Sequence, residues 1–510
     1  MSNYDATTAL LFLAAFVILG LGFKRARSMG KLGLLSWLQS IALMGPWLLM
    51  FGLLNFGITL NVASILVIVV VSIGVYIALG RRLRYLASQD LAGQETRPSP
   101  PSVSPLEVSQ GDPSSNTVEP SEPNGQPSAS PDISQKGITP ISDQDLQLVQ
   151  SIFSPETFAC NPNQVLKYQD GVIIQGYLKG DAATVHHQLS QRLESKIPEQ
   201  YRLFLVENTD EKPVVIVLPR RNDPKVGGWT QQLFAAILSV ATVGSCLIAG
   251  AFLLSFNLIE QPERLSEALP IGLGLVGVLV AHEVGHHLTA QRYQVKLSWP
   301  FPFPALQIGS FGVFNRFESL LPNRQSLFDI AFAGPAVGGL FALVLLILGF
   351  LLSPANPVLS LDISFLQGSI LVGVLARLFL GNTLQGATVL VHPLVGVGWM
   401  GLVITALNLM PAGCLDGGRI IQSIYGRKIA RVSTWITLVV LAIIALANPI
   451  ALYWAIIILL LQRDLERPSL NELTEPDDTR AALGLAALFI MVAILMPLSP
   501  SLASRIGIGA

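Results

Sequence analysis

Long runs of apolar residues recur along the chain and predict helices that cross a lipid bilayer. A hydrocarbon core of roughly 30 Å takes about 20 helical residues to cross, so an uncharged run of that length is a candidate span. Candidate runs lie at 7–23, 33–54, 59–79, 230–255, 270–290, 327–352, 393–412 and 481–498, with a tight hairpin of shorter runs at 432–447 and 449–462. Because a helix satisfies its own backbone hydrogen bonds in lipid, the pattern predicts an all-α polytopic membrane protein with about 10 spans.

The run at 365–390 differs from the others because it carries Arg377 and several glycines. We expect it to be interfacial or re-entrant, with the Arg377 guanidinium extended toward the polar headgroups. It is therefore left out of the count of spans.

Basic residues at the ends of the runs predict which side of the membrane each loop faces. Lys and Arg next to spans stay on the cytoplasmic side. They follow the first and third runs and precede the fourth, as Lys24, Arg25, Arg27, Lys31, Arg81, Arg82, Arg84, Arg220, Arg221 and Lys225. The N-terminus is therefore predicted outside and the region between the third and fourth runs in the cytoplasm. The fifth run then crosses from outside to inside, so its C-terminal end is cytoplasmic.

Two unlike regions separate the third run from the fourth. Residues 86–140 are rich in Pro and Ser and nearly free of large apolar side chains, so they cannot bury enough surface to fold and predict a disordered linker. Within residues 141–226, the patterns at 142–153 and 181–197 indicate helices and those at 171–180, 201–207 and 213–219 indicate strands, which predicts a small cytoplasmic α+β domain. The predicted domains are 1–85 (three spans), 86–140 (linker), 141–226 (soluble domain), 227–420 (membrane core) and 421–510 (C-terminal spans).

Composition agrees with a membrane protein and disfavours several functional classes. Hydrophobic residues make up 51% of the chain and charged residues 13%, which is a membrane rather than a soluble balance. The net charge is −1, so no overall field predicts a nucleic-acid partner. The three cysteines, Cys160, Cys246 and Cys414, form no CxxC spacing, which argues against a disulfide framework or a thiolate zinc site.

The sequence HEVGH, which begins at His282, places metal-binding side chains at the end of the fifth run. On a helix, His282 and His286 lie one turn apart on the same face and can bind one metal ion. Glu283 falls beside that face, where it can take a proton from a metal-bound water. His287 points about 100° away around the helix and is predicted to be neither ligand nor base. The alternative is a polar cluster that only packs, but polar groups at membrane depth are usually functional.

A third ligand is predicted from a later span. Catalytic zinc usually takes three protein ligands and leaves one position for water. The run at 393–412 ends in NLMPAGCLDGGRI, where Pro411 and Gly413 break the helix just before Asp416. By the orientation count this run also crosses from outside to inside, so Asp416 reaches the same depth as the two histidines. An ordinary helix-ending turn with a surface aspartate is the alternative.

These motifs resemble the site-2 protease family of intramembrane zinc metalloproteases. The resemblance rests on HEVGH, on NLMPAGCLDGG in a later span and on the single reversed span between them, and it extends over most of residues 270–420. It implies a zinc metalloendopeptidase of regulated intramembrane proteolysis, with transmembrane proteins as substrates. The residues that it implies are His282, His286 and Asp416 as Zn²⁺ ligands, Glu283 for activation of water, and Asn408 for positioning the scissile carbonyl.

Longer segments resemble one branch of that family, the ethylene-dependent gravitropism-deficient and yellow-green-like proteases of chloroplasts and cyanobacteria. They are GSFGVFNRFESLLPNRQSLFDIAFAGPAVGG and VHPLVGVGWMGLVITALNLMPAGCLDGGR. The branch also carries a Gly-Asn-Leu-Arg motif, for which GYLKG at Gly176–Gly180 is the nearest match, with Tyr177 and Lys179 in place of Asn and Arg. No transit segment precedes the first run. We therefore expect a multi-pass protein of the plasma or thylakoid membrane of a cyanobacterium-like cell.

Two further segments have alternative interpretations. LSWPFPFPALQIGSFGVFNRFE at 297–318 is too proline-rich for a span and predicts a hairpin edge. Residues Gly309–Phe314 would then add a strand to an unwound substrate, and the alternative is a plain interfacial loop. AFAGPAVGGLFALV at 331–344 repeats small residues at helical spacing, which favours close helix packing over a direct catalytic role.

Two rival functions stay open at this point. An inactive relative would bind membrane proteins without cleaving them, although the base and all three predicted ligands are present. A cation transporter also carries buried polar groups beside broken helices. Transport does not need a general base next to two metal ligands, so HEVGH favours the protease.

Overall fold

The computed structural model describes a continuous C-terminal part of the chain. It covers residues 141–508, apart from 169, 209–211, 356 and 447, together with isolated positions between 23 and 82. The chain divides into two units, Met1–Asp132 and Ile133–Ala510, and the elements below belong to the second. The three predicted N-terminal spans fall largely outside the described residues, and the predicted linker at 86–140 falls wholly outside them.

A four-stranded antiparallel sheet organises the region that follows residue 141. Its strand order is β1-β2-β4-β3, and the pairing of β2 with β4 places Ile173 opposite Ile216. Buried apolar residues of β2, β3 and β4 pack with those of α5 into one core. The elements are α4 (Asp143–Gln150), β1 (Phe158–Tyr168), β2 (Gly171–Leu178), α5 (Ala182–Lys196), β3 (Tyr201–Glu207), β4 (Pro213–Pro219) and η1 (Arg220–Asn222).

Both helices and three of the four strands of this region agree with the sequence patterns, whereas β1 was not predicted. Ser142 caps α4 and Asp181 caps α5, each accepting a hydrogen bond from a backbone N–H three residues on. Strand β1 reads FACNPNQVLKY, so Pro and Asn interrupt the alternation that marks a strand. Its pairing with β2 accordingly shifts register between Cys160 and Val165.

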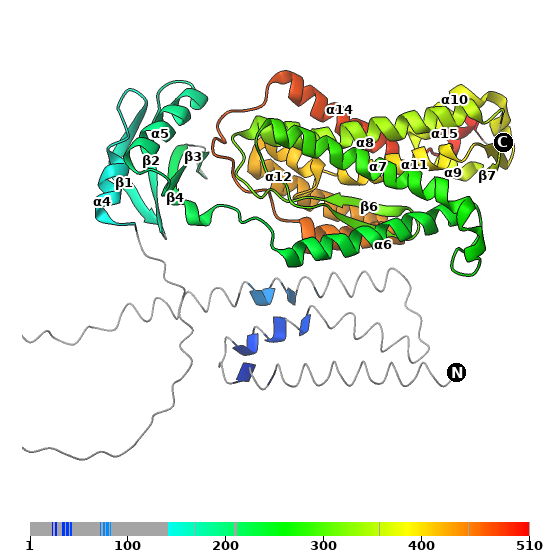
Figure 1. Ribbon diagram of the computed structural model, residues 1–510, viewed down its shortest axis with the longest axis horizontal. Coiled ribbons are helices and arrows are strands. Elements are labelled where there is room, and N and C mark those ends of the chain that lie inside the picture. Colours follow the sequence, from blue (N-terminus) through cyan, green and yellow to red (C-terminus); the bar gives the residue numbers. More distant parts are fainter. Residues whose placement is uncertain are drawn as a thin grey trace, which may run out of the picture. The chain divides into compact units, whose positions relative to one another are not determined.

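Four helices in the described part of the chain are long and apolar enough to cross a membrane. They coincide with the predicted runs at 230–255, 270–290, 327–352 and 481–498. Figure 1 shows α7 and α8 running side by side. The total of about 10 spans is not confirmed. The four helices are α6 (Trp229–Leu253), α7 (Leu265–Arg292, preceded by η2 at Pro262–Arg264), α8 (Arg324–Leu352) and α14 (Asp478–Leu495).

The other apolar runs form shorter or bent helices. The run predicted at 393–412 becomes α11 (Leu394–Asn408), which stops before Pro411 because proline cannot continue a helix. Helix α12 (Asp416–Ile444) bends at Gly426, where φ is 78°. It packs against α13 (Pro449–Ile457) across the turn at Asn448, which agrees with the predicted hairpin. Two further short helices are η4 (Ile458–Gln462) and α15 (Pro500–Arg505).

The run at 365–390, predicted as interfacial or re-entrant, forms short helical segments that lie between two paired strands. Strands β7 (Leu359–Asp362) and β8 (Thr388–Val391) form an antiparallel pair. Arg377 donates to the carbonyl of Gly381 at 2.7 Å, so its guanidinium binds at the C-terminal end of the helix. The predicted contact of Arg377 with lipid headgroups stays a prediction. Between the strands lie α9 (Ile363–Gln367), α10 (Ile370–Leu380) and η3 (Gly381–Gln385).

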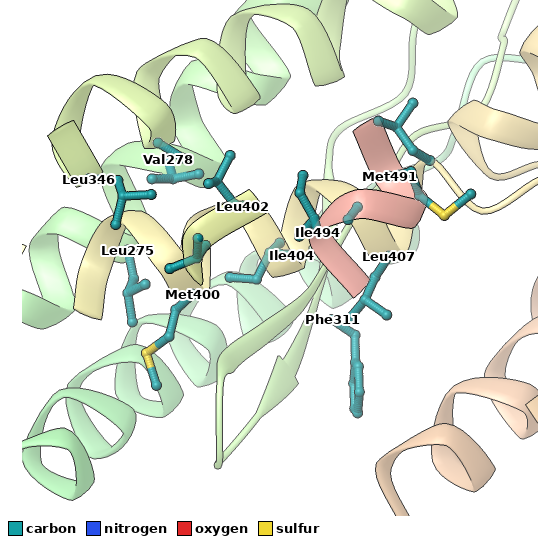
Figure 2. Packing of buried hydrophobic residues seen from close by; sticks show 14 of the residues in the cluster. Leu275, Val278, Phe311, Leu346, Met400, Leu402, Ile404, Leu407, Met491 and Ile494 are labelled. Atoms are coloured by element: carbon teal, nitrogen blue, oxygen red, sulfur yellow. The ribbon is translucent and has the colours of Figure 1, made fainter. Parts of the chain in front are cut away.

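Helix α11 lies at the centre of the apolar core of residues 229–508, which are called the membrane part below. Nearly all of its residues are buried, and it packs against α7, α8, α14 and strand β6 (Gly309–Phe314). Figure 2 shows side chains of α11 surrounded by those of the neighbouring elements. The α11 side chains labelled there are Met400, Leu402, Ile404 and Leu407, and their neighbours are Leu275, Val278, Leu346, Phe311, Met491 and Ile494. This packing fixes where α11 ends, and so where the chain turns toward Asp416.

The proline-rich segment at 297–318 forms the predicted hairpin. Strands β5 (Phe301–Ala305) and β6 (Gly309–Phe314) pair antiparallel, with an irregularity after Phe303. Every residue of β6 is buried, and Gly312 adopts a φ of 120° that favours glycine. The hairpin packs against α6, and Phe311 stacks on Trp454 of α13 at a ring-centroid distance of 5.4 Å. Strand β6 is therefore held inside the membrane part, close to α11.

The segment at 463–477, which joins η4 to α14, runs between the sheet and the membrane part. The backbone at Leu205 in edge strand β3 exchanges hydrogen bonds with Leu470 and Glu472 at 2.8 and 2.9 Å. On its other side, the same segment donates from Leu470 N to the carbonyl of Leu321 at 2.9 Å. A C-terminal segment thus covers the edge of a sheet built from residues more than two hundred positions earlier.

Candidate metal centre

Helix α7 brings the two histidines of HEVGH together on its buried face. It runs without a break to Arg292, so His282 and His286 are one turn apart, and their Nε2 atoms lie 3.1 Å from each other. The two residues are only 3% and 0% exposed. The Nδ1 of His286 lies 2.7 Å from the carbonyl of Ile330 on α8. If Nδ1 donates there, Nε2 is left with the lone pair that a metal ion needs.

Asp416 reaches the histidines because the chain turns tightly after α11. Gly413 has a φ of 48°, and a Cβ at this position would overlap the carbonyl oxygen of Gln462. A Cβ at Gly417 would likewise overlap the carbonyl oxygen of Leu409, so only glycine fits either position without a backbone shift. The turn directs the carboxylate inward, where it is 5% exposed and belongs to one cluster with both histidines.

The geometry of this cluster fits a zinc ion. Zinc bound by His nitrogen and carboxylate oxygen at about 2.0 to 2.2 Å in a tetrahedral site holds its ligand atoms roughly 3.3 Å apart. Asp416 Oδ2 lies 3.1 Å from His282 Nε2, and Oδ1 lies 3.4 Å from His286 Nε2. The two nitrogens lie 3.1 Å apart, and one ligand atom from each of the three residues lies within 4.8 Å of the other two, so the three side chains are close enough to bind one ion. Three protein ligands leave the fourth position for water or substrate.

Small residues on α8 allow this helix to lie against the histidine rings. A Cβ at Gly334 would overlap Nε2 of His286 and lie 2.5 Å from both Cδ2 and Cε1 of the ring. A Cβ at Gly338 would lie 2.7 Å from Cβ of His282. A Cβ at Gly285 of α7 would lie 2.5 Å from the carbonyl oxygen of Ala333 on α8. The close packing predicted for 331–344 therefore occurs directly at the proposed ligands.

The carboxylate of Glu283 lies beside the cluster, with its two oxygens in different surroundings. Oε1 is 3.0 Å from Nδ1 of His287 and 3.5 Å from Nδ2 of Asn315. Oε2 is buried and has no hydrogen-bond partner among the described residues. His287 is outside the ligand cluster, as predicted, but it contacts the predicted base. The spacing of four between Glu283 and His287 was the signal for this contact, since such pairs are neighbours on a helix.

A buried arginine joins this carboxylate to the turn that carries Asp416. Arg419 is 3% exposed and donates to Oδ1 and to the backbone carbonyl of Asn315, at 2.8 and 2.7 Å. It also pairs with Glu466 at 3.1 Å and lies over the ring of Phe317, 4.7 Å from its centroid. The sequence did not point to Asn315 or Arg419, because their partners lie far away along the chain.

Comparisons with known proteins identify the family. Residues 271–447 match the family described as Peptidase family M50, and residues 147–224 match the EGY3 middle domain. The chain is 35% identical over 374 residues to "Probable zinc metalloprotease EGY1, chloroplastic" of Arabidopsis thaliana, an alignment that covers 67% of this chain and 68% of that protein. The chain belongs to peptidase family M50. It is an EGY-like member, as its motifs predicted.

Other relatives of this M50 protein carry similar names. It is 36% identical over 357 residues to "Probable zinc metalloprotease EGY2, chloroplastic" of Oryza sativa subsp. indica, and that alignment covers 69% of this chain but 65% of the relative. It is 30% identical over 384 residues to "Probable zinc metallopeptidase EGY3, chloroplastic" of Arabidopsis thaliana, with the same two shares. The chain thus spans somewhat less than two thirds of the length of these relatives. No solved structure matches it.

Asn408, the remaining predicted site residue of this M50 protein, lies at the end of α11 beneath β6. It is 2% exposed and donates from Nδ2 to the carbonyl of Ile404 at 2.9 Å. A Cβ on Gly312 of β6 would overlap its amide, so the strand passes directly over it. Asn408 has no hydrogen bond to the three proposed ligands within the described ranges. Its predicted role at the scissile carbonyl stays a prediction.

The variant motif GYLKG lies at the end of β2, away from the metal centre. Tyr177 is 70% exposed, and Gly180 has a φ of 122° where the chain turns into α5. The N–H of Lys179 donates to the carbonyl of Thr157 at 2.9 Å, which closes the sheet at this corner. These contacts explain the glycine but give no function to the exposed tyrosine.

An apolar pocket of about 410 Å³ reaches Glu283 from the side of α6. It lies among α6, α7 and the β5–β6 hairpin, and Glu283 and His287 supply the titratable groups in its wall. Val280 and Val284 of α7 line it and are 55% and 44% exposed, so the pocket continues into the apolar surface of the helix. The remaining lining residues are Ser239, Thr242, Val243, Val276, Leu279, Pro300, Pro302 and Val313.

Proposed function

We propose that this protein is an intramembrane zinc metalloprotease that hydrolyses peptide bonds of membrane-spanning proteins. The observation that carries the proposal is the buried cluster of His282, His286 and Asp416, with the Glu283 carboxylate beside it, at the end of an apolar helix. Structural packing does not require three metal-binding side chains within 4.8 Å of one another together with a buried carboxylate oxygen that has no partner among the described residues. Zinc-dependent hydrolysis uses three such ligands, and a free carboxylate oxygen can act as its base.

Each of the proposed site residues has its own role in the proposed hydrolysis. Zinc held by the three ligands would lower the pKa of a water molecule to about 7 and polarise a peptide carbonyl. Glu283 accepts the proton of that water on Oε2, the oxygen without a partner, and donates it to the leaving amine. Asn408 donates to the scissile carbonyl after turning its amide away from Ile404.

The substrate class follows from the pocket beside Glu283. Its wall is mostly apolar and opens along lipid-facing side chains of α7. An apolar side chain next to the scissile bond can lie there while the bond itself approaches Glu283. We therefore propose transmembrane protein segments as substrates, reached from the bilayer.

A helical substrate must be unwound before its carbonyls can react, and β6 is the element proposed to hold it. Strand β5 pairs with one edge of β6, and the residues of β6 are buried beside α11. Addition of an extended substrate strand at Gly309–Phe314 would supply backbone hydrogen bonds to the unwound chain. If proline at Ile308 or Val313 leaves cleavage of a membrane substrate unchanged, strand addition at this site is wrong.

The membrane orientation is also a proposal. The distribution of Lys and Arg supports a cytoplasmic position for residues 141–226 and for the metal centre. The relatives are named as chloroplastic, and for this chain we propose the plasma or thylakoid membrane of a cyanobacterium-like cell. Labelling of a cysteine introduced at exposed Tyr177 with a membrane-impermeant reagent tests the orientation, because labelling of intact cells from outside would reverse it.

The deciding experiment compares wild type with Glu283→Gln, which keeps the size of the side chain but cannot accept the proton. Zinc content and cleavage of a model transmembrane substrate are measured on the purified full chain. We expect one zinc per chain in both proteins and cleavage only by wild type. Glu267→Gln is the matched control, since Glu267 lies in the exposed first turn of the same helix and should cleave as wild type.

The alternatives give other outcomes. Stoichiometric zinc without cleavage by either protein favours a relative that binds membrane proteins without cutting them. Cation flux into vesicles that contain the protein, without cleavage, favours a transporter. Equal cleavage by wild type and Glu283→Gln would show that Glu283 is not the base.

A further inference from the structure

The amide of Asn315 faces Glu283 in only one of its two orientations, and Arg419 selects that orientation. A guanidinium offers donors and no acceptor, so the atom of Asn315 that faces it at 2.8 Å must be Oδ1. The amino group Nδ2 is then the atom that points toward Glu283, at 3.5 Å from Oε1. The reverse orientation would set Oδ1 against an ionised carboxylate, which is an acceptor only.

Arg419 is itself held from several sides. Glu466 pairs with its Nε and Nη2 at 3.1 Å, and the ring of Phe317 covers one face of the guanidinium. Glu466 is fixed in turn by Gln422, which accepts from the Glu466 N–H at 3.0 Å and donates to its carbonyl at 3.1 Å. A buried, fully paired guanidinium is rigid, because breaking one of its pairs leaves a charge without compensation.

The result is a carboxylate with unequal oxygens. Oε1 of Glu283 faces two donors, His287 Nδ1 and Asn315 Nδ2, whereas Oε2 is buried without a partner. A carboxylate bound through one oxygen cannot rotate freely, so the free oxygen keeps a fixed direction. In a general base, the free oxygen is the one available to take a proton.

We propose that Asn315 and Arg419 are positioning residues for Glu283: Arg419 orients the Asn315 amide, and the amide, with His287, holds Oε1 so that Oε2 is the proton-accepting oxygen. The proposal rests on the proposed function, in which Glu283 is the base. It assigns to the arginine of the LDGGR sequence a role in proton transfer, although Arg419 does not touch the base.

A second buried arginine provides a matched control. Arg324 is 8% exposed, donates to the carbonyls of Ser423 and Ile424 at 2.7 Å, and pairs with Glu475. It thus resembles Arg419 in burial and in its backbone partners, but none of those partners contacts Glu283. Arg419 also lies 3.8 Å from Oδ1 of Asp416, a contact that Arg324 does not make, so the zinc content separates an effect on the metal centre from an effect on Glu283. A loss caused only by removal of a buried guanidinium should be the same at both positions.

The test uses the full chain in detergent with Asn315→Leu, Arg419→Gln, the double variant and Arg324→Gln. For each we measure zinc content, thermal unfolding, and kcat and KM for a model transmembrane substrate. We expect Asn315→Leu and Arg419→Gln each to lower kcat by about 10- to 100-fold, with KM within about twofold and zinc retained. Because both residues act through one amide, the double variant should lose no more than the larger single loss. Arg324→Gln should lower the unfolding temperature without this change in kcat.

Several outcomes would overturn the proposal. It fails if Asn315→Leu keeps a wild-type kcat, if the double variant loses the product of the single losses, or if the loss of kcat goes together with loss of zinc. Should Asn315→Leu not fold, Asn315→Ser, which is smaller and cannot reach Glu283, must show the same selective loss of kcat. If the wild-type protein binds zinc but does not cleave the substrate, both the proposed function and the positioning role are wrong. If the wild-type protein cleaves the substrate and Asn315→Leu has the same kcat, only the positioning role is wrong.

Discussion

Gly334→Ala should remove zinc from the protein although residue 334 is not a ligand. Gly334 lies on α8 against the ring of His286, and an added Cβ would lie 2.5 Å from two ring carbons and overlap Nε2. Ordinary contact between such atoms begins near 3.4 Å, so the ring or α8 must move by at least about 0.9 Å to relieve the two carbons, and by more to relieve Nε2. Zinc–ligand distances tolerate only about 0.2 Å, so a shift of this size removes His286 from the site.

The expected magnitude follows from the loss of one ligand of three. Displacement of groups that only support a ligand typically costs 10- to 100-fold in metal affinity. Loss of the ligand itself should cost at least the upper figure, on the order of 100-fold or about 2.8 kcal/mol. Activity should fall with zinc occupancy and should recover in part when zinc is added in excess.

The assay is competition for zinc with a chelator of known affinity, on purified protein whose folding is checked by thermal unfolding. Gly339→Ala on the same helix is the control, because a Cβ there meets only Cγ2 of Thr405, at 3.3 Å. The reasoning is refuted if Gly334→Ala binds zinc as tightly as Gly339→Ala while both are folded. It is also refuted if both variants lose zinc equally, since that would reflect α8 packing in general.

Two further predictions concern the pocket and the sheet. Val284→Phe should fill the apolar pocket beside Glu283 and shift cleavage toward substrates with smaller residues next to the scissile bond, whereas Val344→Phe, at an α8 position of equal 44% exposure, should not. A substrate series from Ala to Phe measures this, and equal profiles for both variants would contradict it. Burial raises the pKa of Asp170, but its hydrogen bonds with Arg221 and Asn222 outweigh this and hold the pKa below its usual range. Since the folded pKa is the lower one, this stabilisation is present at neutral pH and is lost as pH falls below about 4. The hydrogen-exchange protection factors of amides near the β1–β2 turn should therefore fall more in acid for wild type than for Asp170→Asn, and equal changes in protection would contradict this.

The cluster of the three proposed ligands was largely predictable because its main signals are local. Spacing of four on one helix places His282 and His286 on one face, and α7 shows that arrangement. The position of Asp416, the third proposed ligand, required one non-local step, the count of membrane crossings, which predicted that it lies at the depth of the histidines. The end of the helix before Pro411 and Gly413 was also predictable from the sequence, because proline ends a helix. In the structure, only glycine fits at position 413 without a backbone shift.

The surroundings of Glu283, the proposed base, were not predictable in the same way. Asn315 follows β6, and its partner Arg419 lies 104 positions later, so no local pattern links them. The spacing of four residues predicts that Glu283 and His287 are neighbours on the helix surface. It does not predict whether their side chains approach closely enough to make contact, as they do here. Likewise, β7 and β8 have four residues each, too few for an alternation to stand out from the helical residues between them.

The covered edge of β3 has a consequence for synthesis of the protein. The strand Tyr201–Glu207 is complete long before Leu470–Glu472, which hydrogen-bonds to its edge, has left the ribosome. At about 5 to 20 residues per second, that interval is roughly 15 to 50 s, during which the long helices α6, α7 and α8 and the shorter apolar helices up to α13 must be made and inserted. An uncovered strand edge invites pairing with another chain. The nascent protein should therefore depend on a chaperone or on rapid membrane insertion during this interval, and chains truncated before residue 470 should aggregate through β3.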